Sequence, residues 1–466
     1  MSTPQIIEFS YLAAAICFIF ALKGLSSPKS ARNGSIIGII GMIIALVATF
    51  NLPNVLHIVP LASTIGIGGI VGTIIARKIA MTAMPQLVAG FHSFVGLAAV
   101  LVAYAALLAP QNFLVGSSGH FPMGALIEMS LGASIGAITF SGSIIAFGKL
   151  QGLIGAKPIK FPGQQYACFL MMCAIITLMY KFATNGSLLL FTIFVILSTI
   201  IGILLIIPVG GADMPVVVSM LNSYSGWAAA GIGFTLGNSL LIITGALVGA
   251  SGAILSYIMC KAMNRSLISV IFGAFQKTDT KLDTGADDDR VAKISSAEDA
   301  AFMMHKAESV IIVPGYGMAV AQSQHAIKEM TEILRKAGVL VRFAMHPVAG
   351  RMPGHMNVLL AEANIDYDDV LELDEINGDF GSTDIVLVIG ANDVTNPAAK
   401  TDELSPIYGM PVLDVGLARS VLFIKRSMSP GYAGIQNELF FQDNTLMLFG
   451  DAKKVVEDIV KSLQDF

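Results

Sequence analysis

The sequence is poor in charged residues. Only 13% of its 466 residues are Asp, Glu, Lys or Arg, about half of the roughly 25% that is usual in soluble globular proteins. Hydrophobic residues make up 55% of the chain, and the mean hydropathy is +0.74. These values exclude an ordinary soluble domain and place the chain among membrane proteins.

Acidic residues are nearly absent from the first 260 positions. That stretch contains only Glu8, Glu128 and Asp213 of the 32 acidic residues in the chain. The first half is therefore suited to lipid and the second half to water. The net charge of -4 shows no basic excess of the kind that nucleic-acid-binding proteins carry, so we expect no nucleic acid partner.

Cysteine is also scarce. The four cysteines, Cys17, Cys168, Cys173 and Cys260, lie in or beside apolar runs. Their spacing matches no metal-ligand pattern and no disulfide framework, so we expect neither a metal site nor disulfides. The first apolar run has no basic segment before it and no small-residue cleavage site, so we expect no signal peptide to be removed.

Long apolar runs fill the first half of the chain. A membrane-crossing helix needs about 20 predominantly apolar residues. The sequence predicts nine such spans, at 6–22, 36–50, 58–76, 87–109, 123–148, 166–180, 188–209, 214–236 and 240–260. The second and sixth are short, at about 15 residues, and would have to extend into their polar flanks to cross a bilayer.

Basic residues between the spans predict the orientation. With nine spans, only Lys181 falls on the side opposite the polar half of the chain. The basic residues on the same side as the polar half are Lys23, Lys29, Arg32, Arg77, Lys78, Lys149, Lys157 and Lys160. Because short cytoplasmic loops are rich in Lys and Arg, we expect a multi-pass protein of the cell inner (plasma) membrane with its soluble half on the cytoplasmic side.

The fourth span contains a histidine, His92. Polar side chains inside lipid are costly, and a histidine titrates near neutral pH. His92 is therefore either a proton-relay group or a hydrogen-bonded packing residue, and we favour the relay. Asn222, near the middle of the eighth span, carries an amide that could pair with His92 or hold a water molecule.

The second half has the pattern of an α/β domain. We predict strands at 310–313, 340–344, 384–390, 421–424 and 445–449, and helices at 319–337 and 451–463, the latter with Asp451 as its N-cap. Strands that alternate with helices indicate a Rossmann-like, doubly wound parallel sheet. We therefore expect a polytopic α-helical membrane domain at 1–263, a polar linker at 264–290 and this soluble α/β domain at 291–466.

A glycine-rich turn follows the first predicted strand. The residues Gly315-x-Gly317-x-x-Val320 match a dinucleotide-binding turn in which the third glycine is replaced. The first two glycines allow a sharp turn and a close approach to a pyrophosphate at the helix N-terminus. The strand before the motif and the helix after it supply the context that the motif requires.

Cationic residues follow two other strands. Arg351 comes after the second strand, and Lys425 and Arg426 come directly after the strand at 421–424. Ligands of such sheets bind beyond the carboxyl ends of the strands, so these cations favour a phosphate-rich ligand, and a ribose 2′-phosphate would account for all three. The alternative is a solvated basic rim. Asp393 is either a turn residue or a carboxyl whose proton is coupled to cofactor binding.

Five stretches of this sequence are long and unusual: Met214–Trp227, Gly315–Val320, His346–Asn357, Gly390–Asp393 and Lys425–Ser427. Through them the chain resembles the beta-subunit family of proton-translocating NAD(P)+ transhydrogenases along essentially its whole length. The resemblance implies hydride transfer between NAD(H) and NADP(H) coupled to proton movement across the membrane. It also implies that inward proton flow would drive NADPH formation.

The resemblance assigns roles to individual residues. His92 and Asn222 match the proton pathway, Asp393 matches a carboxylate that links protonation to cofactor occupancy, and the three cations match the 2′-phosphate site. With the glycine turn included, the implied NADP(H)-binding residues are Gly315, Tyr316, Gly317, Met318, Val348, Ala349, Gly350, Arg351, Met352, Pro353, Gly390, Ala391, Asn392, Asp393, Val394, Gly409, Met410, Lys425, Arg426, Ser427, Met428, Ser429, Pro430, Gly431, Tyr432, Asp451 and Ala452.

A single dinucleotide fingerprint is not enough for this reaction, because hydride transfer needs both a donor and an acceptor nucleotide. The second site must come from another chain. The resemblance names it as an alpha subunit that binds NAD(H), in a dimer of alpha–beta heterodimers. Two alternatives stay open: an ion channel or transporter with a nucleotide-sensing domain, although we find no selectivity loop, and an NADPH-binding module with passive membrane anchors.

Overall fold

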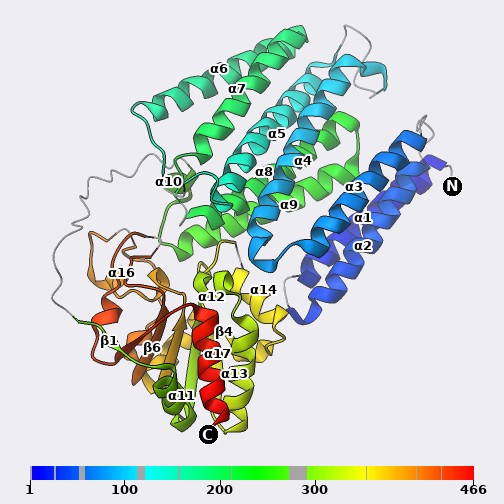
Figure 1. Cartoon of the computed structure of the whole chain (residues 1–466). Helices are drawn as coiled ribbons and strands as arrows, with labels where there is room; N and C mark the ends of the chain where they lie inside the picture. The colour runs from blue at the N-terminus through cyan, green and yellow to red at the C-terminus, as the bar shows by residue number, and fades with distance from the viewer. Residues whose placement is uncertain are drawn as a thin grey trace. The chain divides into compact units, whose positions relative to one another are not determined.

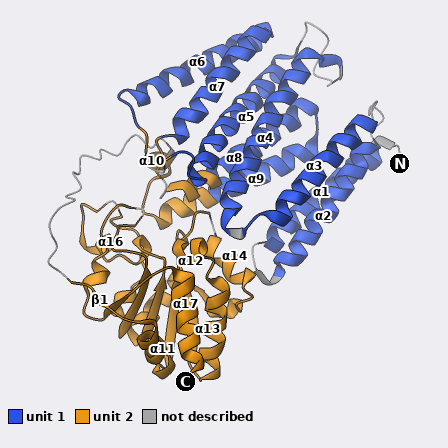
Figure 2. Ribbon diagram, in the orientation of Figure 1, with its two compact units in different colours: residues 1–154, 160–207, 220–254 blue, residues 155–159, 208–219, 255–466 orange. Residues whose placement is uncertain are grey.

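The computed structural model describes residues 3–25, 28–51, 58–112, 121–155, 158–210, 213–271, 291–352, 354–405, 407–431 and 433–466. The chain forms two compact units (Figure 2): unit 1 comprises residues 1–154, 160–207 and 220–254, and unit 2 comprises residues 155–159, 208–219 and 255–466. Of the expected linker at 264–290, residues 272–290 lie outside the described part, and the expected domain boundaries stay predictions.

The first half of the chain is helical, as the apolar runs predict. Its long helices are α1 (Thr3–Leu25), α2 (Pro28–Phe50), α3 (Ile58–Lys78), α4 (Met84–Leu108), α5 (Met123–Leu150), α6 (Gln164–Asn185), α7 (Leu188–Ile206), α8 (Met214–Leu236) and α9 (Ser239–Ala262). All nine expected spans lie on these helices. The two short ones extend into their polar flanks, as α2 with 23 residues and α6 with 22.

Eight helices within the described residues are long and apolar enough to cross a membrane. Of the nine long helices named above, α8 does not meet this criterion, and it carries the polar stretch Asn222-Ser-Tyr-Ser225. In lipid, only structures that satisfy their own backbone hydrogen bonds can span the bilayer, which is why these segments fold as helices.

Glycine allows helices of unit 1 to pack closely. A Cβ atom on Gly231 of α8 would lie 2.5 Å from the Cα atom of Gly132 on α5. Small residues at such crossings let two backbones touch where no hydrophobic force drives helices together. Elsewhere in the unit, the rings of Phe182, Phe191 and Phe194 pack with centroids 5.0–5.6 Å apart.

The second half contains a parallel sheet of seven strands (Figure 1): β1 (Lys293–Ile294), β2 (Ser309–Pro314), β3 (Leu340–Met345), β4 (Val370–Glu372), β5 (Ile385–Ile389), β6 (Ser420–Lys425) and β7 (Thr445–Phe449). The strand order is β1-β7-β6-β5-β2-β3-β4. Strand β5 is buried at every residue, because helices and loops cover both faces of a parallel sheet. On one face, helix α17 (Ala452–Gln464) packs against both α11 (Ala297–Lys306) and α13 (Gln324–Lys336).

Two details of the α/β domain differ from the sequence prediction. The single helix expected at 319–337 is two helices, α12 (Tyr316–Ala321) and α13, because Gln322 adopts a left-handed conformation with φ 53°. The short edge strand β1 and strand β4 were not predicted. By contrast, Asp451 caps α17 as expected, since its side chain accepts a hydrogen bond from the backbone N–H of Lys453 at 3.1 Å.

The sheet order places the site. From β2 the chain moves outward to β3 and β4, and it then returns to the other side of β2 as β5. The connections leaving β2 and β5 therefore diverge, and a crevice forms at the carboxyl ends of these two neighbouring strands. In doubly wound sheets, ligands bind at this point where the order reverses.

Candidate nucleotide site and membrane histidine

Two backbone turns meet at the point where the strand order reverses. The N–H of Gly315 donates to the carbonyl of Ile389 at 2.9 Å, and the N–H of Gly317 donates to the carbonyl of Gly390 at 3.1 Å. A Cβ atom on Gly317 would lie 2.6 Å from the Cα atom of Gly390. We expected these glycines to allow a pyrophosphate to approach the backbone. In the structure, their amides donate hydrogen bonds to the segment at the end of β5, and the absence of side chains lets the turns after β2 and β5 pack closely.

A cavity of about 410 Å³ opens at this crevice. Segments that follow β2, β3, β5 and β6 supply its walls, as expected for a ligand site of a doubly wound sheet. Among the residues that line it are Tyr316, Gly317, Val348, Ala349, Gly350, Arg351, Gly390, Ala391, Asn392, Asp393, Val394, Ile407, Met410, Phe423, Lys425, Pro430, Gly431 and Ala433.

A second cavity of about 290 Å³ adjoins the first, and the two share Gly317, Gly390, Lys425 and Pro430. Its remaining lining residues are Val320, Ile424, Arg426, Ser427, Ser429, Gly450 and Ala452. The two cavities together form an extended, cation-bearing site, which fits an elongated phosphate-containing ligand better than a compact one.

Most of the predicted nucleotide-site residues line one of these two cavities. Six described residues line neither: Gly315, Met318, Met352, Gly409, Met428 and Asp451. Pro353 and Tyr432 lie outside the described residues. Sequence reasoning did not select eight lining residues: Met263, Arg265, Val320, Ile407, Phe423, Ile424, Ala433 and Gly450. Six of these have apolar side chains, which look like core or membrane residues in a sequence.

The three predicted cations lie along the joined cavities. The guanidinium of Arg351 stacks over the Tyr316 ring, 4.2 Å from its centroid. The Lys425 ammonium donates to the carbonyl of Ser429 and lies 4.5 Å from the centroid of the Phe440 ring. Arg426 pairs with Asp451 at 3.5 Å across an exposed surface. Arg351 and Lys425 thus face the first cavity, while Lys425 and Arg426 face the second.

Burial changes the proton affinity of Lys425. Removal from water lowers the pKa of its ammonium to about 8, and the neighbouring Asp393 carboxylate partly offsets this effect. Burial penalises the charged form of a lysine unless an anion lies nearby. A phosphate at this position would supply that anion.

The connection after β5 and the loop after β6 form a polar corner of the first cavity. The Asp393 carboxylate accepts a hydrogen bond from the N–H of Ala433 at 2.9 Å. The Asn392 Oδ1 atom accepts from Asn437 at 3.1 Å, while its buried Nδ2 donor has no partner among the described residues. A Cβ atom on Gly431 would lie 2.4 Å from Asp393 Oδ1. An unpaired donor beside cations fits a ligand that carries hydrogen-bond acceptors.

Two buried histidines hold the loop after β3. His346 donates from Nε2 to the Pro411 carbonyl at 2.8 Å and accepts at Nδ1 from the Val348 N–H at 3.2 Å. His355 accepts at Nδ1 from the Arg351 N–H at 3.2 Å. Burial lowers the pKa of both imidazoles to about 4, and Arg351 lowers that of His355 further. Both side chains are therefore neutral at physiological pH, and their hydrogen bonds to backbone groups fix the loop after β3.

In unit 1, His92 of α4 pairs with α8. Its Nδ1 atom lies 3.0 Å from the Ser225 hydroxyl, and its buried Nε2 atom has no partner among the described residues. We expected Asn222 to be able to pair with His92; the observed partner is one turn further along the same helix. Sequence reasoning therefore missed Ser225, although it lies within the polar stretch that drew attention to α8.

These features define a class of protein. The chain combines helices able to cross a membrane with a doubly wound domain whose cation-lined site lies where dinucleotides bind in such folds. Among the described residues, no cluster of three or more His, Cys, Asp or Glu side chains is placed to hold a metal ion. The class is therefore a membrane protein with a domain of the dinucleotide-binding type.

Comparison with known proteins identifies the family. The family model described as NAD(P) transhydrogenase beta subunit matches residues 7–462. Two curated relatives, from Rhodospirillum rubrum and from a strain of that species, are named NAD(P) transhydrogenase subunit beta. Each is 61% identical over 462 residues, which covers 99% of this chain and 100% of the relative. The chain belongs to the NAD(P) transhydrogenase beta-subunit family.

Family membership defines the general properties of the chain. It is a multi-pass membrane protein and one subunit of an oxidoreductase whose reaction involves nicotinamide nucleotides. A beta subunit implies a partner alpha subunit. Membership therefore favours a transhydrogenase over the channel or transporter that we kept as an alternative.

Proposed function

We propose that this chain is the NADP(H)-binding, proton-translocating subunit of a transhydrogenase that transfers hydride between NAD(H) and NADP(H). Hydride transfer is coupled to proton movement across the membrane, and inward proton flow favours NADPH formation. The observation that supports this assignment best is the pair of joined cavities bordered by Arg351, Lys425 and Arg426 at the carboxyl ends of the strands. A third phosphate group distinguishes NADP(H) from NAD(H), and these cations are suited to bind it.

The residues of this site would bind and orient the nucleotide. Lys425 and Arg426 supply positive charge for the 2′-phosphate, and Arg351 adds a third cation. The unpaired Asn392 Nδ2 donor is available to an acceptor on the ligand. Bound NADP+ supplies the ring that accepts the hydride. The chain needs no general base for this step, because catalysis by direct hydride transfer rests on positioning and on the exclusion of water.

Apolar side chains complete the site. Ile407, Met410 and Phe423 also line the first cavity. Such a surface excludes water from the site. The exclusion of water strengthens the electrostatic interactions inside the site and prevents side reactions at the nicotinamide ring. The transfer itself requires a second nucleotide, which we assign to the NAD(H) site of the alpha subunit.

Proton movement would use the histidine of unit 1. His92 has one nitrogen bonded to Ser225 and the other unpaired among the described residues, an arrangement that leaves one nitrogen for proton exchange. We assign the pathway to His92 and Asn222, and the link to cofactor occupancy to Asp393. By thermodynamic reciprocity, protonation that changes NADP(H) affinity requires NADP(H) to change proton affinity by the same factor.

We further propose the setting in which the chain works. It resides in the cell inner (plasma) membrane, with the α/β domain on the cytoplasmic side, and it assembles as a dimer of alpha–beta heterodimers. The membrane domain comprises residues 1–263, the linker 264–290 and the NADP(H)-binding domain 291–466. The uneven distribution of Lys and Arg between the predicted loops supports this orientation.

Reconstitution tests the proposed function. The chain and its alpha partner would be placed in lipid vesicles that contain a pH-sensitive dye, and hydride transfer from NADPH to an NAD+ analogue would be followed together with the internal pH. We expect hydride transfer accompanied by a pH change that a protonophore abolishes. Hydride transfer without any pH change would refute the coupling, and no transfer at all would refute the enzyme assignment.

A further inference from the structure

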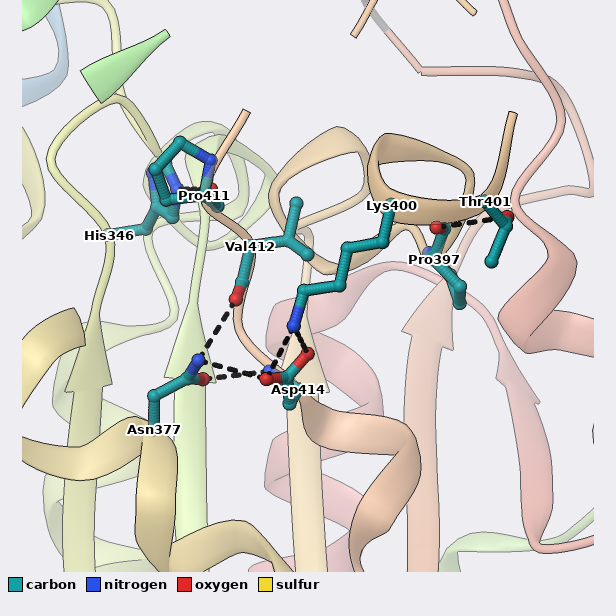
Figure 3. Close-up of polar contacts among 8 residues, drawn as sticks. All are labelled: His346, Asn377, Pro397, Lys400, Thr401, Pro411, Val412 and Asp414. Carbon is teal, nitrogen blue, oxygen red and sulfur yellow. Dashed lines mark hydrogen bonds and ion pairs between the residues drawn. The ribbon is translucent and has the colours of Figure 1, made fainter. Parts of the chain in front are cut away.

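Three polar residues of the α/β domain contact one another where two connections of the sheet meet (Figure 3). Asp414 precedes β6, Lys400 belongs to the short helix α16 (Ala398–Thr401), and Asn377 comes from the connection between β4 and β5. None of the three lines either cavity. They connect two separate stretches of chain at one point, and we name them the Lys400–Asp414–Asn377 clasp.

The clasp closes a loop by an ion pair. The Lys400 ammonium lies 2.5 Å and 2.7 Å from the two carboxylate oxygens of Asp414. Between the end of α16 and Asp414 the chain runs as a loop from Asp402 to Leu413, and the structure describes all of this loop except Pro406. The loop is also pinned inside, where the Gly409 N–H donates to the Ala399 carbonyl at 2.8 Å.

Asn377 holds the same end of the loop from the neighbouring connection. Its Nδ2 atom donates to the Asp414 carboxylate at 3.0 Å and to the Val412 carbonyl at 3.3 Å. Its Oδ1 atom accepts from the Asp414 backbone N–H at 2.9 Å. One amide side chain therefore satisfies three groups of the loop end, so the loop end cannot move without breaking several hydrogen bonds together.

The loop held in this way carries part of the nucleotide site. Ile407 and Met410 line the first cavity and pack with Ala399 and Val412 in a small apolar cluster separate from the main core. His346 adds a second tie, since it donates to the Pro411 carbonyl at 2.8 Å (Figure 3). The far end of the loop has two further anchors, because the Leu413 N–H donates to the Val394 carbonyl at 2.9 Å and the Leu413 side chain is buried in the main core. The part that carries Ile407 and Met410 has only its own small cluster, so it depends more on such ties than an element of the main core does.

We propose that the Lys400–Asp414–Asn377 clasp holds the Asp402–Leu413 loop against the nucleotide cavity and thereby sets the rate at which NADP(H) leaves the site. The inference rests on the proposed function, because it requires the nucleotide to occupy that cavity. The three residues act as positioning residues: they touch the loop, and Ile407 and Met410 of the loop face the nucleotide. Breaking the clasp loosens the wall, so the nucleotide leaves faster, while the NAD(H) site on the partner is untouched.

Two variants break the ion pair in different ways. Lys400→Met removes the ammonium, whereas Asp414→Asn removes the charge but keeps an oxygen that can accept from Asn377. In the full chain assembled with its partner, displacement of bound NADPH by excess NADP+ would be followed by NADPH fluorescence. We expect the dissociation rate to rise about threefold to fivefold in each variant, as the loss of a partly exposed ion pair predicts. The double variant should be no faster than the faster single variant, because both remove one interaction.

Further measurements separate positioning from general destabilisation. Lys400→Arg should restore the original rate, because a guanidinium can still pair with Asp414. The KM for NADP(H) should rise in the Lys400→Met enzyme, while the KM for NAD(H) should stay the same. Lys293→Met is the matched control: Lys293 pairs with Asp443 at 3.0 Å on edge strand β1, and its side chain is 51% exposed, against 53% for Lys400. We expect this control to leave NADPH dissociation unchanged.

Several results would overturn the inference. Unchanged dissociation in both Lys400→Met and Asp414→Asn would show that the clasp does not hold the nucleotide. An equal acceleration in Lys293→Met, or no recovery in Lys400→Arg, would show that the effect is not specific to this ion pair. If the unmutated chain binds no NADPH, the proposed function fails and the clasp fails with it; if it binds NADPH and the variants behave normally, only the clasp fails.

Discussion

The backbone of Gly317 touches the backbone of Gly390, and the Gly317 N–H donates to the Gly390 carbonyl at 3.1 Å. This contact joins the turns that leave β2 and β5, the two strands between which the sheet order reverses. Both glycines line both cavities. The close packing of these two turns, which carry no side chains at the contact, therefore forms part of the wall of both cavities.

A side chain at Gly390 should damage both the fold and the site. Its φ of +65° disfavours any residue with a Cβ atom, and that atom would lie 2.3 Å from the Cα atom of Gly317. We expect Gly390→Ala to lower the free energy of unfolding by about 2–4 kcal/mol through backbone strain and overpacking. Denaturant unfolding and NADPH titration would measure this. Gly378→Ala is the control, since a Cβ atom there meets nothing within 4 Å; equal effects in the two variants would contradict the account.

The cation pair after β6 should discriminate between the two nucleotides. Replacing both Lys425 and Arg426 by Met removes two positive charges from the second cavity. We expect the KM for NADP(H) to rise roughly 10-fold to 100-fold, as the loss of one or two charge-assisted hydrogen bonds predicts, with little change in the KM for NAD(H). Lys453→Met, which removes an exposed partner of Glu457 on α17, is the control. An equal loss for both nucleotides would remove the 2′-phosphate assignment.

NADPH affinity should fall as the pH rises above about 8. The pKa of Lys425 is lowered to about 8 by burial, and a bound phosphate raises it by favouring the charged form. Below pH 8 the lysine is charged in both the free and the bound states, so its contribution is fully present. Above that pH the free protein must take up a proton to bind, and affinity is lost.

Calorimetric titration from pH 7 to 9.5 would measure the decline in NADPH affinity. Lys425→Arg stays charged and should show a flatter profile; a decline as steep as in the unmutated chain would contradict this cause.

Replacement of the membrane histidine should uncouple proton movement from turnover. In the vesicle assay with the alpha subunit present, we expect His92→Ala to abolish proton movement. Ser225→Ala should reduce it, because the hydroxyl that orients His92 Nδ1 is lost. Ser130→Ala is the control, since that buried hydroxyl bonds to the Ile127 carbonyl of its own helix. Normal pumping together with normal turnover in His92→Ala would exclude the relay.

Most strands of the sheet could be predicted from the sequence, but the two edge strands could not. Strands β2, β3, β5, β6 and β7 could be predicted because each has five or six residues and most of them are hydrophobic. Strands β1 and β4 have two and three residues, and pairing with a neighbouring strand defines them. The break between α12 and α13 falls at Gln322, where neither glycine nor proline marks it.

The lining of the two cavities was predictable where charged or polar residues follow a strand. Arg351, Lys425 and Asp393 stand out in the sequence because charged residues follow strands at the ligand-binding edge. Ile407 and Phe423 do not, because an apolar residue that lines a cavity has the same character as one in the core. Asn377 and Asp414 meet across two connections of the sheet, and no local pattern could have paired them.

Nucleotide preference tests the central claim most directly. The purified full-length chain, without its alpha partner, would be titrated with NADPH and with NADH, and binding followed by nucleotide fluorescence. The account predicts saturable binding of NADPH and at least about 100-fold weaker affinity for NADH. The reason is that NADH lacks the 2′-phosphate with which the cations at the border of the site would pair. Equal affinity for the two nucleotides, or binding of NADH alone, would contradict the claim that this chain holds NADP(H).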